Sequence, residues 1–238
     1  MLGIFGVPLQ ESIPYAHVAI SVTKDGKSEL YGYIPIVVAK CGMFLKSKGT
    51  KVEGVFRVSG ASKRINELQT IFNCPPKFGK GLSWEGFTVH DAANVFRRYL
   101  RELPEPIIPY DFYDKFRDAV IEDGHESDEE RSIQSLQTLI SELPVLNSRL
   151  LLYILDLLAV FDSNSSINLM PASNLAAIFQ PGVLSHADHE MSPHEYIRSQ
   201  NTLAFLIKHQ DKFYVGPASP DDIVLPGQSY QGSADTRD

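Results

Sequence analysis

Three short segments contain the polar residues that are candidates for binding or catalysis. The first, residues 52–60, places Arg57 between Phe56 and Val58, two apolar residues that we expect to anchor a short loop in the core. A long cation on such a pinned loop is held in a fixed place, where it can neutralise an anionic group or form a structural salt bridge. Spacing alone favours the structural salt bridge.

The second segment, residues 90–106, contains a positively charged helix face. Arg97 and Arg101 are four residues apart and share one side of the helix, whereas Arg98 points about 100° away. Glu102 lies four residues beyond Arg98, but Arg97 and Arg101 have no acidic neighbour at that spacing. Two uncompensated arginines on one face can hold a carboxylate or a phosphate, although charged stripes are more often simply solvated.

The third segment, residues 170–184, places Asn174 within an apolar helical stretch. An asparagine buried there without a hydrogen-bond partner would be costly. Its side chain therefore either makes a hydrogen bond inside the domain or points into a functional site, and the spacing leaves both readings open.

Other kinds of catalytic site find little support in the sequence. His186, His189 and His194 are close together, but no helical apolar pattern holds them in register, which favours exposed loop histidines over a metal site. Nucleophile-elbow, P-loop and dinucleotide-binding motifs do not occur. Cys41 and Cys74 are predicted to be buried free thiols of a reducing compartment. The chain alone shows no means of activating a small substrate.

Composition describes a soluble globular protein of 238 residues, 43% hydrophobic and 21% charged. No apolar run approaches the ~18 residues of a membrane span, and the N-terminus is unlike a secretory signal. A net charge of −7 argues against a general nucleic-acid binder. Residues 40–101 nevertheless carry a net charge of +8, which leaves −15 for the rest. This basic segment predicts an anionic partner surface.

An alternating pattern at residues 18–26 predicts a short hairpin. Helical periodicity begins after this stretch, from residue 34 onward. Expected helices cover residues 34–48, 59–74, 88–103, 111–121, 129–143, 145–161, 172–179 and 192–213. Thr88 and Asp91 have the spacing of a capping box, and Ser59 is the expected cap of the second helix. The very apolar stretch 145–161 predicts a central core helix.

These elements predict an all-α protein with a single helical domain. Residues 1–33 form an irregular or hairpin-like N-terminal segment packed on the domain, and residues 34–215 form the helical domain itself. Residues 216–238, rich in Pro, Gly, Ser and Asp, are predicted to be a disordered tail.

In their order and separation, the three segments resemble the GTPase-activating domain of the RhoGAP family. GVFRVSG at 54–60 resembles the arginine-finger motif, RYLRELPEP at 98–106 the family's most characteristic run, and NLAAIFQP at 174–181 its third motif. FGVPL at 5–9 is similar to the start of such domains, so the likeness spans residues 5–213. The overall amino-acid sequence is most similar to those of fungal members of the family.

The resemblance implies a bundle of about nine helices with a flat face that docks on a Rho-family small GTPase in its GTP-bound form. Arg57 would be the arginine finger, a catalytic cation supplied in trans. The GTPase-binding residues implied are Lys63, Arg97, Arg101, Asn174 and Pro181. GTP and Mg²⁺ would be carried by the partner, so the chain needs no cofactor or metal of its own and turns over no substrate alone.

Three positions depart from the family pattern. Arg97 stands where lysine is usual, Gly182 where asparagine is common, and Gln180 replaces a small residue. Exchanging a lysine for a planar arginine shifts the contact, and glycine at 182 removes one hydrogen bond to the GTPase.

Two other functions remain as alternatives. One is a catalytically inactive module that only binds GTP-loaded GTPases, which an intact Arg57 disfavours. The other is docking of the basic segment on anionic lipid as the primary role. We expect a cytoplasmic monomer, with recruitment to the plasma membrane or cell cortex as a further expectation.

Overall fold

The computed structural model describes residues 3–24, 27–121, 126–189, 191–214 and 216. Its elements, in chain order, are α1 (Leu9–Ser12), β1 (His17–Lys24), β2 (Lys27–Pro35), α2 (Ile36–Lys48), α3 (Ser62–Asn73), α4 (Val89–Glu102), α5 (Tyr110–Asp118), α6 (Glu126–Glu142), α7 (Val145–Asp162), α8 (Ser165–Asn168), α9 (Ala172–Val183), the 3₁₀ helix η1 (Ala187–His189), α10 (Pro193–Lys208) and the 3₁₀ helix η2 (Gln210–Lys212). The all-α prediction is confirmed, with one small sheet near the N-terminus.

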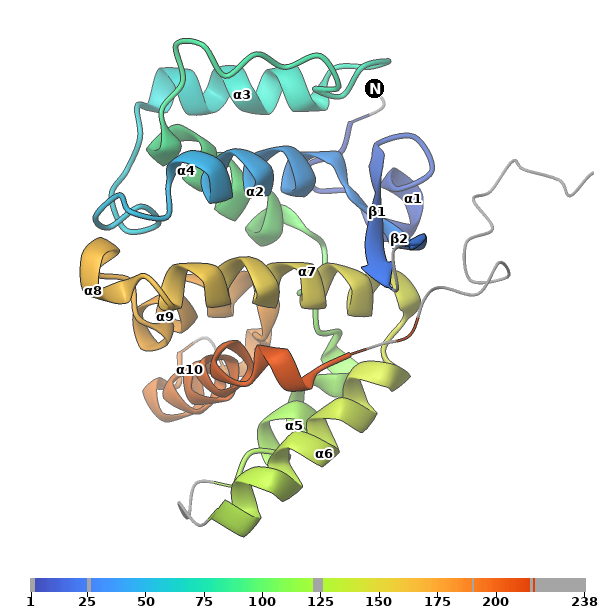
Figure 1. Cartoon of the computed structure of the whole chain (residues 1–238), viewed down its shortest axis with the longest axis vertical. Helices are drawn as coiled ribbons and strands as arrows, with labels where there is room; N and C mark the ends of the chain where they lie inside the picture. The colour runs from blue at the N-terminus through green and yellow to red at the C-terminus, as the bar shows by residue number, and fades with distance from the viewer. Residues whose placement is uncertain (1–2, 25–26, 122–125, 190, 215, 217–238) are drawn as a thin grey trace, which may run out of the picture.

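Helix α7 lies in the middle of the molecule (Figure 1). Helices α2, α3 and α4 lie on one side of it, and α9 and α10 lie on the other. Leu151, Ile154 and Leu158 of α7 are fully buried. A helix with apolar residues on all sides must be covered on all sides, so the prediction of a central core helix is confirmed.

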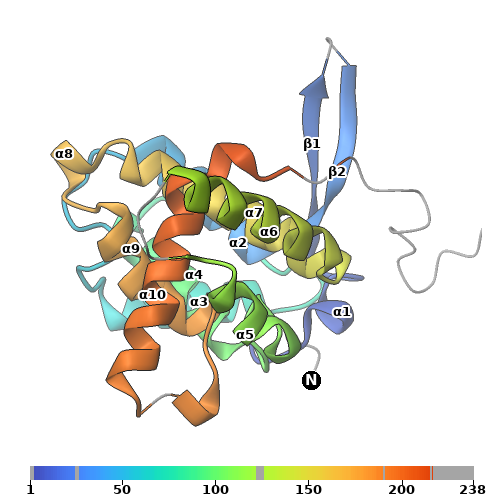
Figure 2. The ribbon, with the colours of Figure 1, turned by 90° about the horizontal axis from the view of Figure 1, so that it is seen from below.

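Strands β1 and β2 form the predicted hairpin, which extends away from the helices (Figure 2). The proposed turn at residues 25–26 lies outside the described residues. The predicted helix start at residue 34 is wrong, because Ile34 and Pro35 pair with Val18 and His17 in the ladder. Pro35 then immediately precedes α2, where its fixed φ and missing N–H are tolerated.

The start of α3 differs from the prediction for a tertiary reason. Ser59 does not cap the helix, which begins three residues later at Ser62. The carboxylate of Asp91 in α4 instead accepts the N–H of Ala61, 2.9 Å away. The predicted capping box of Thr88 and Asp91 does form at the start of α4.

Helix α9 continues past the proline predicted to end it. Pro181 lies inside the helix, which ends at Val183. A proline cannot donate to the carbonyl four residues earlier, here that of Ala177. The hydroxyl of Tyr196 in α10 donates to that carbonyl instead, at 3.3 Å, so a neighbouring helix stabilises the interrupted ladder.

The last helix begins where the sequence predicts but ends earlier. Ser192 is the N-cap residue of α10 and Pro193 its first residue, although the Ser192 side chain makes no capping hydrogen bond. The expected capping-box partner Glu195 pairs instead with the buried Arg117. Helix α10 ends at Lys208, before the expected boundary. The short helices α1 and α8 were not predicted.

The cysteine prediction is half right, because Cys41 is buried but Cys74 is exposed. Among the described residues, no helix is long and apolar enough to cross a membrane. The domain boundaries at residues 33 and 215 stay predictions, and the tail predicted from residue 216 lies beyond the described residues except for its first one.

Candidate functional site

Arg57 lies on the loop between α2 and α3, residues 49–61, which we call the Arg57 loop. The preceding Phe56 is fully buried and makes edge-to-face contacts with Phe161 and Phe179, at ring-centroid distances of 4.8 and 5.0 Å. The side chain of Arg57 itself is exposed. The loop thus presents a cation to solvent from a backbone that the core holds in place.

Gly54 shapes the loop beneath this cation. Its φ is +62°, a left-handed conformation that glycine adopts without strain. Its carbonyl accepts the N–H groups of Arg57 and Val58, each at 2.8 Å. A Cβ at Gly54 would lie 3.5 Å from Nε of Arg57, so the arginine side chain lies across the glycine.

Helix α4 holds the loop from the other side. Nη1 of Arg97 donates to the carbonyl of Phe56 at 2.8 Å, directly before Arg57. Nδ2 of Asn94 donates to the carbonyl of Val58 at 3.2 Å, directly after it. The backbone carbonyls of both residues that flank Arg57 are therefore bound by side chains of one helix face.

His90 extends this face by one more turn, and our sequence analysis did not single it out. Its Nδ1 lies 3.4 Å from the carbonyl of Val55 in the Arg57 loop. The signal in the sequence was its spacing, because His90 precedes Asn94 by four residues and Arg97 by seven.

Arg97 is half-buried, which changes its electrostatics. Burial, and then the positive charge of Arg101, lower the pKa of Arg97 below its usual value. Within the described part of the chain its Nε has no hydrogen-bond partner. Arg97 thus supports the Arg57 loop while adding charge to the surface beside it.

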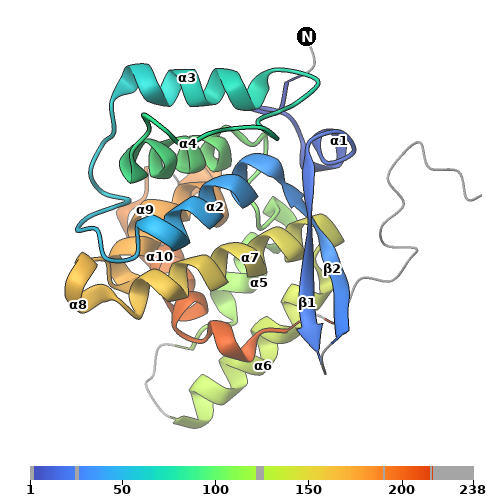
Figure 3. The ribbon, with the colours of Figure 1, turned by 45° about the horizontal axis from the view of Figure 1, so that its top comes forward.

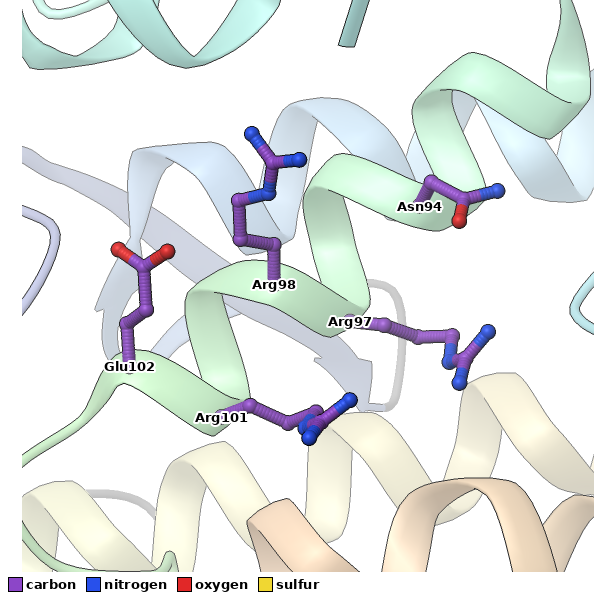
Figure 4. Close-up of a pocket in the computed structure, with 5 residues that line it drawn as sticks. All are labelled: Asn94, Arg97, Arg98, Arg101 and Glu102. Carbon is purple, nitrogen blue, oxygen red and sulfur yellow. The ribbon is translucent and has the colours of Figure 1, made fainter. Parts of the chain in front are cut away.

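The arginines of α4 border a cavity of about 410 Å³. Arg97 and Arg101 project on one side of the helix, whereas Arg98 and Glu102 project on another (Figure 4). Arg98 donates to the side-chain oxygens of two α3 residues, at 2.8 and 2.7 Å. Arg101 is exposed and, among the described residues, has neither a hydrogen bond nor an ion-pair partner. Arg98 is therefore structural, and Arg101 is available to a partner.

Asp91 fixes the relation between α3 and α4. Its buried carboxylate accepts hydrogen bonds from Arg64 and Thr88 as well as from the backbone of Ala61. Burial works to raise the pKa of Asp91, but the hydrogen bonds from Arg64, Thr88 and Ala61 together outweigh it and lower the pKa. The ionised form is thus the one that holds the two helices.

Asn174 is exposed near the start of α9, and its Nδ2 lies 3.4 Å from the carbonyl of Leu169. This contact fits the reading of a hydrogen bond inside the domain, and the reading of Asn174 as part of a functional site stays a prediction. Asn168, which precedes Asn174 by six residues, is buried. Its backbone carbonyl accepts the N–H of Gly54 at 2.8 Å. Asn168, which sequence reasoning missed, is the residue that joins this segment to the Arg57 loop.

The remaining positions with an expectation from the sequence are Arg101, Lys63, Pro181 and Gly182. Pro181 and Arg101 border a second cavity of about 320 Å³. Lys63 is exposed in the first turn of α3. Gly182 is buried, and a Cβ there would lie 3.0 Å from Cβ of Leu100 in α4, so this position faces α4. The assigned roles of these residues stay predictions.

Two of the three clustered histidines are less exposed than predicted, whereas His194 is exposed as expected. His186 and His189 are half-buried and pack against the ring of Tyr113, at centroid distances of 5.3 and 5.5 Å. Nη1 of Arg117 donates to Nδ1 of His189 at 3.2 Å. Across the described residues, no group of three or more His, Cys, Asp or Glu side chains is placed to hold a metal ion.

Comparison with known proteins identifies the protein family of this chain. Residues 35–188 match the family model described as the RhoGAP domain. The chain belongs to the RhoGAP family. This match includes α2 through α9, and therefore the Arg57 loop and the α4 face that holds it.

Two fungal relatives extend the likeness. The chain is 52% identical over 211 residues to Rho-GTPase-activating protein 5 of Schizosaccharomyces pombe, covering 88% of this chain and 58% of that protein. It is 41% identical over 225 residues to Rho-GTPase-activating protein BAG7 of Saccharomyces cerevisiae, covering 94% of this chain and 54% of that protein. The chain thus spans somewhat more than half the length of these relatives. The expected resemblance to fungal RhoGAP proteins is confirmed.

A solved structure supports the fold. The crystal structure of human Rho GTPase activating protein 15 superimposes with a TM-score of 0.68 at 24% identity, covering 76% of this chain and 84% of that one. At this level of identity the match shows a shared RhoGAP-type helical fold.

Proposed function

We propose that this RhoGAP domain accelerates GTP hydrolysis by a Rho-family small GTPase, with Arg57 as the catalytic arginine supplied in trans. The observation that carries the proposal is the fixed backbone beneath an exposed guanidinium. Phe56 is anchored in the core, and Arg97 and Asn94 bind the carbonyls on either side of Arg57. A preorganised cation of this kind needs little reorganisation at the moment of reaction.

The chemistry follows from the charge that develops during phosphoryl transfer. Negative charge spreads over the oxygens of the transferred γ-phosphoryl group, and a GTPase without a nearby cation hydrolyses GTP slowly. An arginine supplied in trans accelerates the reaction by ~10³ to 10⁵ in this class of enzymes. That factor corresponds to roughly 4 to 7 kcal/mol of transition-state stabilisation.

The other basic residues of the site act in binding. Arg101 lies on the same side of α4 as Arg97 and is open to a partner (Figure 4). We assign Arg101, Lys63, Asn174 and Pro181 to the docking surface for the GTP-bound GTPase. The partner carries GTP and Mg²⁺, and the RhoGAP domain acts as a monomer without a cofactor of its own.

Single-turnover GTP hydrolysis on a panel of GTP-loaded Rho-family GTPases tests this function. The wild-type chain is expected to accelerate hydrolysis, and Arg57→Ala to lose most of the acceleration while its affinity for the GTPase stays within a few-fold. Arg131→Ala is the matched control, because Arg131 is an exposed arginine of α6 whose ion-pair partner among the described residues, Asp128, lies in the same helix.

Two results would contradict the proposal. Unchanged acceleration by Arg57→Ala would exclude Arg57 as the catalytic arginine. Binding of the wild-type chain to GTP-loaded GTPases without any acceleration would identify a binding module instead.

A further inference from the structure

Exposed apolar side chains lie beside the catalytic arginine. Val58 follows Arg57 directly, and Ile167 and Leu169 flank Asn168, whose backbone carbonyl binds Gly54 of the Arg57 loop. The exposed fractions of Val58, Ile167 and Leu169 are 45%, 52% and 45%. Figures 1 and 3 both show α8 next to the loop that joins α2 to α3. We call these three residues the apolar collar.

Gly54 connects the members of the collar. A Cβ at Gly54 would lie 3.2 Å from Cγ2 of Val58, so the Val58 side chain packs over the glycine. The N–H of the same glycine donates to Asn168, which lies between Ile167 and Leu169. The collar is therefore linked through Gly54 to the backbone from which Arg57 projects.

Leu169 is held in an unfavourable conformation. Its φ is +56°, in the left-handed region that costs a branched L-residue roughly 1–2 kcal/mol. Asn168 fixes the preceding position, because its side chain binds the carbonyls of Thr50 and Phe161 and the N–H of Met170. Strain that the surroundings enforce on an exposed apolar residue is typical of a functional position.

We propose that the apolar collar docks on apolar side chains of the partner GTPase that border its bound GTP, and so excludes water from around Arg57. This inference rests on the proposed function and assigns a binding role to three further residues. Its support is the continuity of the collar with the Arg57 loop. A cation acts more strongly on a developing charge when water is excluded, and apolar contacts around a central polar group commonly provide that exclusion.

The key variant is Leu169→Asn, because asparagine tolerates the left-handed conformation but is polar. Its thermal stability is expected to equal or exceed that of the wild type, while KM for the GTP-loaded GTPase rises roughly tenfold, in line with a lost apolar contact. Ile167→Asn is expected to raise KM in the same direction. Tyr214→Asn is the control, since Tyr214 is 53% exposed and its backbone binds Gln137 of α6.

The outcomes separate the collar from the catalytic arginine. Wild-type KM in both Leu169→Asn and Ile167→Asn, together with lost acceleration in Arg57→Ala, would overturn the collar and keep the proposed function. A rise in KM that Tyr214→Asn reproduces would also overturn the collar. Failure of the wild-type chain to bind any GTP-loaded GTPase of the panel would overturn both.

Discussion

The half-buried side chain of Arg97 binds the peptide group that precedes Arg57. The hydrogen bond from its Nη1 to the carbonyl of Phe56 connects residues 41 positions apart in the sequence. A lysine can donate to one carbonyl as a point charge, but a planar guanidinium can hold the carbonyl and still present its other nitrogens to the adjoining cavity. The arginine at this position thus suits a loop-positioning role.

Removing Arg97 should therefore impair catalysis through the loop. We expect Arg97→Ala to lower kcat for the stimulated GTP hydrolysis about tenfold and to destabilise the fold by about 1–3 kcal/mol, because the Phe56 carbonyl loses its donor. Arg97→Lys should keep most of the wild-type kcat, because a lysine can also donate to the Phe56 carbonyl. Single-turnover kinetics and urea unfolding measure both effects.

Arg98→Ala is the control for this prediction, because Arg98 binds α3 and not the Arg57 loop. It should lower stability without lowering kcat. An unchanged kcat in Arg97→Ala, or an equal loss of kcat in Arg98→Ala, would contradict a specific role of Arg97 in loop positioning.

At the scale of elements, α4 organises the site. Its first turn is closed by the Thr88–Asp91 capping box, and the same Asp91 binds the residue before α3. Further along, Asn94 and Arg97 bind the Arg57 loop. Helix α4 therefore sets the position of both the Arg57 loop and α3, the helix that follows this loop.

Helix α9 depends on α10 at the point where Pro181 interrupts its hydrogen bonds. Tyr196→Phe should cost about 1 kcal/mol of unfolding free energy, because the Ala177 carbonyl loses the hydroxyl that binds it. Pro181→Ala supplies a backbone N–H for that carbonyl, so Tyr196→Phe should cost less in the Pro181→Ala background. Urea unfolding of the four proteins of this cycle measures the coupling. An equal cost in both backgrounds would show that the hydroxyl does not replace the missing N–H.

At the scale of the whole molecule, charge is distributed unevenly along the chain. Residues 40–101, with a net charge of +8, run from within α2 through the Arg57 loop and α3 into the last turn of α4, in a protein of net charge −7. A local positive field beside the docking surface should speed the approach of an acidic partner surface, and salt should screen it.

Charge reversal at one exposed lysine tests this field. Lys63→Glu should lower the association rate with the GTP-loaded GTPase several-fold at low salt, and the difference from wild type should shrink as ionic strength rises. Lys208→Glu, at the end of α10 and outside the basic segment, makes the same charge change and should have a smaller effect. Stopped-flow association kinetics over a salt series distinguishes the two. Equal effects of both variants would indicate net charge alone.

Features that depend on local chemistry were predictable from the amino-acid sequence. Apolar periodicity revealed the central helix α7, a residue pair three apart revealed the cap of α4, and a cation between two apolar neighbours drew attention to Arg57. These signals are readable because helical spacing and capping involve residues within one or two turns.

The three-dimensional structure was needed to reveal how the site is held together. It showed that Arg97 binds the Phe56 carbonyl and that Asn168 joins α8 to the Arg57 loop. It also showed that the hydroxyl of Tyr196 binds the α9 carbonyl to which Pro181 cannot donate. Each of these contacts satisfies a backbone polar group with a partner distant in sequence. Local sequence shows that such a group needs a partner, but only the packing of the helices decides which residue provides it.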